Sequence, residues 1–209
     1  MMTAEALAFF DQVLIVLGLG LVLFGLSRRS VELAHNWARV YAVLVLVAWG
    51  ARFWHAGHLP IFGAYESALS LAAFTGATLW IMGSRTKEPL LFLYTPTAAL
   101  LLYHGTRYSR EVWALTISER GFWVHFHAIL AFLAFGFAMA LVSASVLVFR
   151  GRKPPLKRIL LGFLALYTLN IVSGSYYRFL LFGKAWSFDP IEAMNLACFL
   201  AFTTVIHMI

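Results

Sequence analysis

The stretch FWVHFHAILAFLAFGFAMALVSASVLVF, residues 122–149, decides the fold class of this chain, because it contains no Asp, Glu, Lys or Arg. A helix needs roughly 20 apolar residues to cross the hydrocarbon core of a bilayer. The rest of the chain has a matching composition. Hydrophobic residues make up 62% of the 209 residues and charged residues 12%, whereas soluble domains contain about 25% charged residues. The protein is therefore expected to be an integral membrane protein.

Apolar runs of similar length recur along the whole sequence, with no soluble domain or internal repeat between them. The runs are residues 7–27, 37–54, 65–83, 89–105, 122–149, 159–177 and 190–209. We predict an all-α, polytopic helical bundle of about seven transmembrane helices, with residues 1–209 as one domain. Glu5 precedes the first run and Asp11 lies near its start, and there is no Lys or Arg there, so this run is not expected to be a cleavable signal peptide. Cys198, the one cysteine, excludes an intramolecular disulfide or a CxxC motif.

Basic residues are concentrated in alternate connections between the runs. One set comprises Arg28, Arg29, Arg85, Lys87, Arg150, Arg152, Lys153, Lys157 and Arg158. The smaller opposite set comprises Arg107, Arg110, Arg120, Arg178 and Lys184. Because cytoplasmic loops carry the excess of Lys and Arg, the first set is predicted to be cytoplasmic and the N-terminus outside. The net charge of +7 is then a topology signal, and no nucleic-acid partner is expected.

An aromatic loop precedes the last apolar run and is predicted to face outward. Asp189, Pro190 and Glu192 have the spacing of an N-cap, a first helical residue and a capping-box carboxylate. Three large apolar side chains come before or within this cap, Phe182, Trp186 and Phe188. The loop is either an interfacial anchor or a platform for a flat apolar ligand.

Three of the seven histidines lie near the predicted outer end of the fourth and fifth runs. His104 ends the fourth run, and His125 and His127 open the fifth. Because residues two apart on a helix point in different directions, only one of the last two can face a given pocket. Trp123 precedes His127 by four residues, so this ring and the imidazole share one helix face.

The other histidines have different expected positions. His35 is expected to be solvated in a cytoplasmic loop, and His58 lies in the first outward loop beside Gly57. His207 follows Asp189 by 18 residues, which places it about 27 Å further along the last helix, near the cytoplasmic edge.

Two carboxylates near membrane spans have structural interpretations beside functional ones. Glu66 is expected to pair with Arg52 near the interface, and Glu192 to cap its helix. Asn170 and Asn195 are expected to form hydrogen bonds between helices.

The sequence lacks the motifs of several other kinds of site. It has no HExxH or CxxC metal motif and no glycine-rich phosphate loop, and no intramembrane carboxylate is placed to orient a Ser or Cys triad. The remaining pattern, imidazole near aromatic rings at a membrane face, is the chemistry of haem. An ordinary interfacial belt of aromatic residues is the alternative.

Three collinear blocks resemble the CcsA/ResC type of haem-handling protein from the System II pathway of cytochrome c biogenesis. Residues 52–67 resemble the block R-W-x-x-x-G-H-F-P-x-x-x-x-Y-E-S, with Phe53 in place of the Trp. Residues 123–127 resemble its W-x-x-x-H motif. Residues 182–192 resemble its tryptophan-rich W-G-x-x-W-x-W-D-P-x-E loop, the WWD signature, and Gly174 precedes that loop at the family spacing.

The resemblance implies a haem b cofactor, with His127 as an axial ligand at the outer face and His207 as a ligand within the membrane. It implies that a set of loop residues presents the macrocycle: Phe182, Gly183, Trp186, Phe188 and Asp189. Trp123 and His58 join the expected haem-binding residues. His127 and Trp186 must then converge on one ligand.

The implied function is haem transport and presentation across the membrane, for covalent attachment to apocytochrome c. The chain would be the haem-handling component of a cytochrome c synthase with a CcsB/ResB-like partner, in a bacterial cytoplasmic membrane or a thylakoid membrane. A HemX-like regulator of haem synthesis, or a structural or electron-transfer subunit of a membrane complex, are the alternative functions.

The sequence departs from the family pattern in two ways. Phenylalanines replace two of the three signature tryptophans, which keeps a flat surface but removes an indole N–H donor. The family continues into a further helix with a second external histidine, which the given sequence lacks. Either the given sequence is truncated relative to the gene and lacks a final helix, or the outer haem site lacks its usual second ligand. In the second case His104 and His58 are the candidate substitutes.

Overall fold

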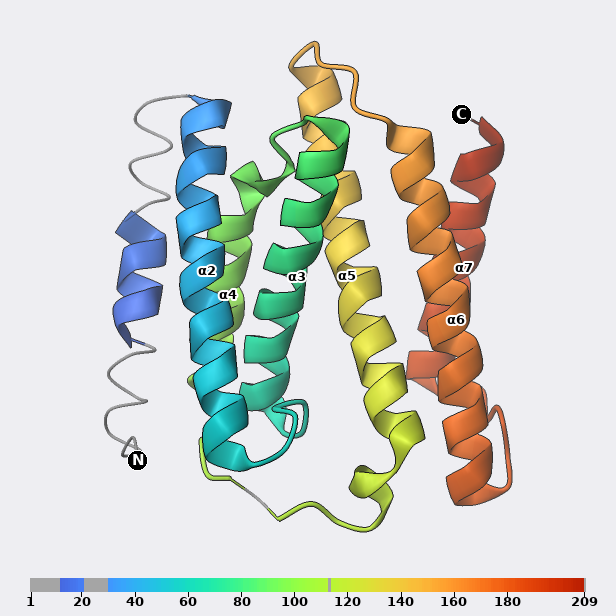
Figure 1. The fold of residues 1–209 in the computed structure, drawn as a ribbon. Coiled ribbons are helices and arrows are strands. Elements are labelled where there is room, and N and C mark those ends of the chain that lie inside the picture. Colours follow the sequence, from blue (N-terminus) through green and yellow to red (C-terminus); the bar gives the residue numbers. More distant parts are fainter. Residues whose placement is uncertain (1–11, 21–29, 113, 209) are drawn as a thin grey trace.

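The computed structural model describes residues 12–20, 30–112 and 114–208. Within these ranges the chain forms helices and no strands, so the predicted all-α bundle is confirmed (Figure 1). Residues 12–20 are helical, and the elements after them are α2 (Val31–Ala56), α3 (Ala64–Thr86), η1 (Leu90–Leu93), α4 (Tyr94–Gly105), η2 (Ser118–Arg120), α5 (Phe122–Phe149), α6 (Leu156–Phe182) and α7 (Pro190–Met208).

Five of these helices, α2, α3, α5, α6 and α7, are long and apolar enough to cross a membrane. The chain is therefore a multi-pass membrane protein. The fourth predicted run differs from the others, because it forms the 3-10 turn η1 and then a helix of 12 residues. At 1.5 Å per residue α4 is about 18 Å long, too short to cross the bilayer core alone. The structure describes residues 12–20 of the first predicted run, 7–27, and the rest of that run lies outside the described residues.

The packed part of the bundle contains α2, α3, α4, α5 and the first turns of α6, and α7 lies beyond it, against α6 (Figure 1). Two buried tyrosines form hydrogen bonds between neighbouring elements in this region. The Tyr41 hydroxyl donates to the Leu14 carbonyl at 3.0 Å, and the Tyr94 hydroxyl donates to the Ala72 carbonyl at 3.1 Å. Gly76 makes room for Tyr94, because a Cβ at this position would lie 2.7 Å from the ring. Small residues on α3 thus allow its neighbours to approach closely.

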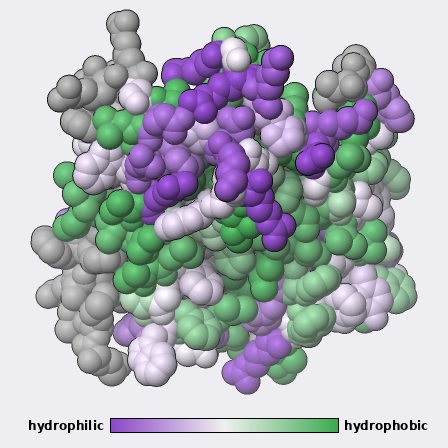
Figure 2. Space-filling model, turned by 45° about the horizontal axis from the view of Figure 1, so that its top comes forward, coloured by the Kyte–Doolittle hydropathy of each residue, from purple (hydrophilic) through white to green (hydrophobic). Residues whose placement is uncertain are grey.

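The connections after α3 and α5, which carry basic residues, lie at the same end of the bundle, at the top of Figure 1. Figure 2 shows hydrophilic residues gathered over this end and hydrophobic residues around the sides. This arrangement agrees with the alternation used to predict topology. Arg28 and Arg29 lie outside the described residues, and the side of the membrane that each end faces stays a prediction.

The prediction of a solvated His35 was wrong. Ser30 caps α2, with its hydroxyl accepting from the Leu33 N–H at 3.2 Å, so the helix begins six residues before the apolar run at 37. His35 is consequently helical and only 5% exposed, and its Nδ1 accepts a hydrogen bond from the Leu91 N–H at 3.3 Å. A search for apolar runs does not find a polar first turn of a helix, even when a neighbouring element buries that turn.

The predicted pair between Arg52 and Glu66 is confirmed. The two side chains are 2% and 6% exposed, and Arg52 Nη2 lies 2.8 Å from Glu66 Oε1. Arg52 also donates to the Arg110 carbonyl at 2.7 Å, so the ion pair fixes the connection between α4 and α5 to the bundle. A buried pair with added hydrogen bonds avoids the cost of an isolated buried charge.

Candidate ligand site between α5, α6 and α7

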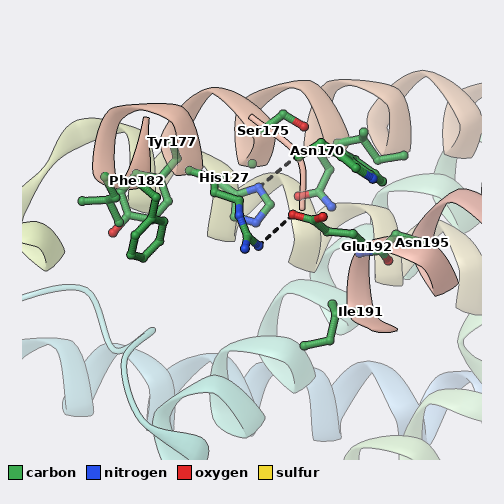
Figure 3. Close-up of a pocket in the computed structure, with 13 residues that line it drawn as sticks. His127, Asn170, Ser175, Tyr177, Phe182, Ile191, Glu192 and Asn195 are labelled. Atoms are coloured by element: carbon green, nitrogen blue, oxygen red, sulfur yellow. Dashed lines mark hydrogen bonds and ion pairs between the residues drawn. The ribbon is translucent and has the colours of Figure 1, made fainter. Parts of the chain in front are cut away.

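A cavity of about 280 Å³ lies where the beginning of α5 meets the second half of α6 and the beginning of α7. Figure 3 shows its lining side chains converging on His127 from α6 and α7. The lining residues are His127, Asn170, Ile171, Gly174, Ser175, Tyr177, Arg178, Leu181, Phe182, Trp186, Ile191, Glu192 and Asn195. Phe182 and Ile191 are 69% and 75% exposed, so the apolar rim of the cavity is open.

The imidazole of His127 has one nitrogen fixed by α6. Its Nδ1 lies 3.1 Å from the Asn170 carbonyl oxygen and 3.3 Å from Ser173 Oγ. A carbonyl oxygen can only accept, so Nδ1 carries the proton in this hydrogen bond. The neutral ring then has a lone pair on Nε2, which is the tautomer that binds a metal or accepts from a ligand.

Gly174 allows the imidazole to lie against α6. A Cβ at residue 174 would be 2.7 Å from His127 Cε1 and 3.3 Å from its Nε2. Any larger residue would therefore displace the ring or break its hydrogen bond to Asn170. The sequence identified this glycine by its spacing from the aromatic loop, and the structure gives the spacing a steric reason.

The aromatic loop is shorter than expected, because α6 extends to Phe182 and the predicted helix ended at 177. Phe182 is the last helical residue, and Gly183 ends the helix with φ 67° and donates its N–H to the Phe179 carbonyl at 2.9 Å. Glycine adopts this left-handed conformation at little cost. Phe188 also has positive φ, 56°, where a bulky residue is strained.

The loop is held by an ion-pair cluster at its base. Arg178 Nη1 lies 2.8 Å from Asp189 Oδ2 and 2.7 Å from Glu192 Oε1, which joins the last turns of α6 to the first turn of α7. Asp189 accepts from the Glu192 N–H at 2.9 Å, as its predicted N-cap role requires. This hydrogen bond, and then the Arg178 side chain, lower the pKa of the Asp189 carboxyl.

The second half of the predicted capping box differs from expectation. Glu192 Oε2 accepts from the Ser187 N–H at 2.7 Å, and not from the N–H of the N-cap residue. The carboxylate thereby orders the loop two residues before the N-cap residue Asp189. Glu192 thus has a structural role in the loop and also lines the cavity.

Three polar atoms among the cavity residues are buried and have no hydrogen-bond partner in the described part of the chain. They are Arg178 Nε, Trp186 Nε1 and Asn170 Oδ1. Unpartnered buried polar atoms are costly, so their concentration around one cavity indicates a polar ligand. From the sequence, Arg178 is expected to be a topology charge and Asn170 a hydrogen-bond partner between helices. The sequence feature that could have indicated a role for Arg178 in the site is its position four residues, or about one helical turn, before Phe182 at the start of the aromatic loop.

Some predicted residues lie outside the lining of this cavity. Trp123 packs edge-on against Tyr176 of α6, with ring centroids 4.6 Å apart, on the His127 side of α5 as expected. Phe188 is 76% exposed and contacts Trp186, with ring centroids 6.1 Å apart. Gly183 and Asp189 shape the ends of the loop without lining the cavity.

The remaining predicted histidines are dispersed. His58 lines a second cavity of about 500 Å³ formed with the α4–α5 connection, and its Nδ1 lies 3.0 Å from the Leu59 carbonyl oxygen. His104 is exposed and packs against Tyr108. His207 is exposed in the last turn of α7, at the far end from His127. None of these three lines the His127 cavity.

Asn195 forms the predicted interhelical hydrogen bond, because its Oδ1 accepts from the Tyr167 hydroxyl of α6 at 2.9 Å. Cys198 is exposed on α7. No protein-family model matches the chain, and no curated protein is significantly similar to it.

Proposed function

We propose that this protein binds haem b in the cavity between α5, α6 and α7 and presents it for attachment to apocytochrome c. The supporting observation is that His127 and Trp186, which are separated by 59 positions in the sequence, line the same cavity. Two of the three family-like blocks therefore contribute to one place, as a shared ligand requires.

The ligand set fits one axial position of a haem. His127 has its Nδ1–H directed to the Asn170 carbonyl, which leaves Nε2 to bind iron. When bound, the iron would supply the redox and ligand-exchange chemistry. His127 is the one histidine among the lining residues, and no Cys or Met joins it there. A second axial ligand would come from outside this set of residues.

The polar groups of the cavity fit the anionic edge of such a ligand. Arg178 Nε and Trp186 Nε1 are buried donors that have no hydrogen-bond partner among the residues that the structure describes. Propionate oxygens accept hydrogen bonds, so they would satisfy both atoms. The Asp189 and Glu192 carboxylates fix the Arg178 guanidinium through its Nη1, which leaves Nε for the ligand.

The rim of the cavity fits the apolar part. Phe182 and Ile191 are exposed, and they offer flat and branched apolar surface beside the polar groups. A cavity of about 280 Å³ is just below the usual range of roughly 300–1,000 Å³ for ligand pockets. We therefore expect a macrocycle held by one edge, with the other edge exposed to lipid or to a partner protein.

His207 does not line this cavity, because it lies at the opposite end of α7. If the protein holds a second haem through His207, the two haems are separate. This proposal predicts that the two histidines act independently, and a double substitution tests that prediction.

The central experiment measures the absorption spectrum of the purified full-length chain after addition of haem. His127→Ala should abolish the Soret band assigned to the cavity, whereas His125→Ala should leave it unchanged. His125 is the matched control, since it lies two residues away, does not line the cavity, and has Nδ1 2.9 Å from the Gly121 carbonyl oxygen. Equal haem retention by the two variants would contradict the proposed ligand.

A second experiment separates haem handling from haem binding. The chain is expressed with a CcsB/ResB-like partner and an apocytochrome c in cells that lack their own attachment system. Covalent haem on the cytochrome should require His127 and not His125. Normal cytochrome with altered haem-precursor levels would instead indicate the regulatory, HemX-like function.

A further inference from the structure

A third cavity, with a polar lining, lies at the end of the bundle away from His127. It has a volume of about 390 Å³ and lies between the beginning of α2 and the connection from α3 to η1. The side chains that matter here are Glu32, His35, Arg39, Lys87 and Glu88. Because α2 and α3 cross the membrane, a cavity at their ends lies at the level of the lipid headgroups.

Hydrogen-bond donors lie on one wall of this cavity. The Leu91 N–H donates to His35 Nδ1, so the neutral imidazole carries its proton on Nε2 and is a donor there. Arg39 Nε is buried and has no hydrogen-bond partner among the described residues. Lys87 ends α3 in the left-handed conformation, with φ 60°, and adds an ammonium group to the lining.

A buried acceptor without a hydrogen bond belongs to the same cavity. Glu88 Oε2 has no hydrogen-bond partner in the described structure, and its nearest charge is Arg152 Nη1 at 3.7 Å. Arg152 is already held by Glu32, with Nη2 2.5 Å from Oε1. The Glu88 carboxylate therefore has remaining capacity for a cation.

The charges of the cavity are mixed. Arg39 and Lys87 are cationic, and Glu32 and Glu88 are anionic. A simple anion in the cavity would therefore lie near two carboxylates, and a simple cation near two positive groups. A ligand that carries both a phosphate and an ammonium group satisfies the donor wall and the Glu88 carboxylate together.

The cavity also depends on a glycine. A Cβ at residue 83 would lie 3.0 Å from the Glu88 carbonyl oxygen and 3.6 Å from His35 Cε1. Gly83 therefore allows the buried imidazole and the turn that carries Glu88 to lie close together. His35 is 5% exposed and forms part of the cavity wall.

We propose that this cavity binds a phosphoethanolamine group. His35, Arg39 and Lys87 bind the phosphate, and Glu88 binds the ammonium. The group is the headgroup of a membrane phospholipid or the free soluble molecule. This site is independent of the haem proposal, because it shares no residue with the His127 cavity.

The test uses native mass spectrometry of the full-length protein in detergent with dioleoyl phosphatidylethanolamine, phosphatidylglycerol or phosphatidylcholine. We expect preferential retention of phosphatidylethanolamine, and at least a tenfold weaker retention by Arg39→Gln. Arg85→Gln is the control, because Arg85 lies in the last turn of α3, next to the connection that carries Lys87 and Glu88, but does not line the cavity. Glu88→Gln should remove the preference over phosphatidylglycerol.

Soluble phosphoethanolamine and inorganic phosphate are added separately as competitors. Arg39-dependent binding of soluble phosphoethanolamine without retained lipid would support the same chemistry from a soluble source. Equal retention of the three lipids, or equal loss in Arg39→Gln and Arg85→Gln, would overturn the proposal. Competition by inorganic phosphate as strong as that by phosphoethanolamine would overturn the role of Glu88.

Discussion

Helices α3 and α7 are both apolar enough to cross a membrane, but they have different environments. More than half of the apolar segment of α3 is buried inside the bundle, 56%, and none of the corresponding segment of α7 is. The α3 surface carries Ala72, Ala73 and Gly76 against neighbouring helices, whereas Met194 and Leu200 of α7 are exposed. The packed region around α3 is thus a scaffold, and α7 is attached mainly through α6.

The difference matters for function because the His127 cavity lies on the loosely packed side. Its walls come from α5, which belongs to both regions, and from α6 and the first turn of α7. Local openings cost least where few apolar contacts are buried. Ligand entry is therefore expected through movement of α7 and the aromatic loop, while the scaffold stays fixed. Three predictions test this contrast, beginning with the largest effect.

The largest loss of stability is expected from Arg52→Ala in the scaffold. The substitution leaves Glu66 buried without its partner and frees the carbonyl of Arg110. Breaking one side of a buried ion pair costs about 3–5 kcal/mol. Thermal or denaturant unfolding of the detergent-solubilised protein measures this loss.

The matched control for this prediction is Arg152→Ala. Arg152 pairs with the exposed Glu32, with side-chain exposures of 39% and 59%, and its other contact with a carboxylate, Glu88, is longer at 3.7 Å. Exposed pairs contribute about 0–1 kcal/mol. Similar losses for the two arginine variants would show that the buried pair does not hold the scaffold together.

An intermediate effect is expected from enlarging one small residue in each region. Ala72→Leu on α3 places a large side chain where the existing residue is fully buried, and overpacking costs about 1–3 kcal/mol. Ala201→Leu on α7 is the matched change at an exposed position, where substitutions usually change stability by less than about 0.5 kcal/mol. Unfolding measurements on both variants compare the two helices, and a large loss at residue 201 would mean that another element covers α7.

The smallest effect is a local dependence on pH at the start of α7. The lowered pKa of Asp189 means that the folded state binds its proton less readily than the unfolded state. The stabilisation is therefore complete above the ordinary carboxyl value of 3.8 and is lost as the pH falls below it. Hydrogen exchange, corrected for intrinsic rates, should then accelerate in residues 187–193 relative to residues 65–80 of α3.

Asp189→Asn is the control for the pH experiment, because asparagine keeps a capping oxygen but does not ionise. Its exchange at residues 187–193 should no longer change over this pH range. An unchanged pH response in the variant would assign the effect to a different carboxylate.

Several parts of the fold were predictable from local patterns. The run at 122–149 became α5 with the same bounds, since its length and lack of charge allow one solution in a bilayer. Asp189 caps α7 as its spacing required. The predicted helices were less accurate where polar residues continue a helix, as at His35 before the second run and at Arg178 after the sixth. Caps and neighbouring elements, and not hydrophobicity, decide those ends.

The sequence alone determined that the chain crosses a membrane several times as helices, because apolar length and the need to satisfy backbone hydrogen bonds in lipid act locally. It also marked His127 and Trp186 as candidates. Only the tertiary structure decided that these two line one cavity, that His58 and His207 do not, and that Arg178 and Asn170 do. The reason is physical: which helix faces meet depends on close packing between distant segments, and no local pattern specifies that packing.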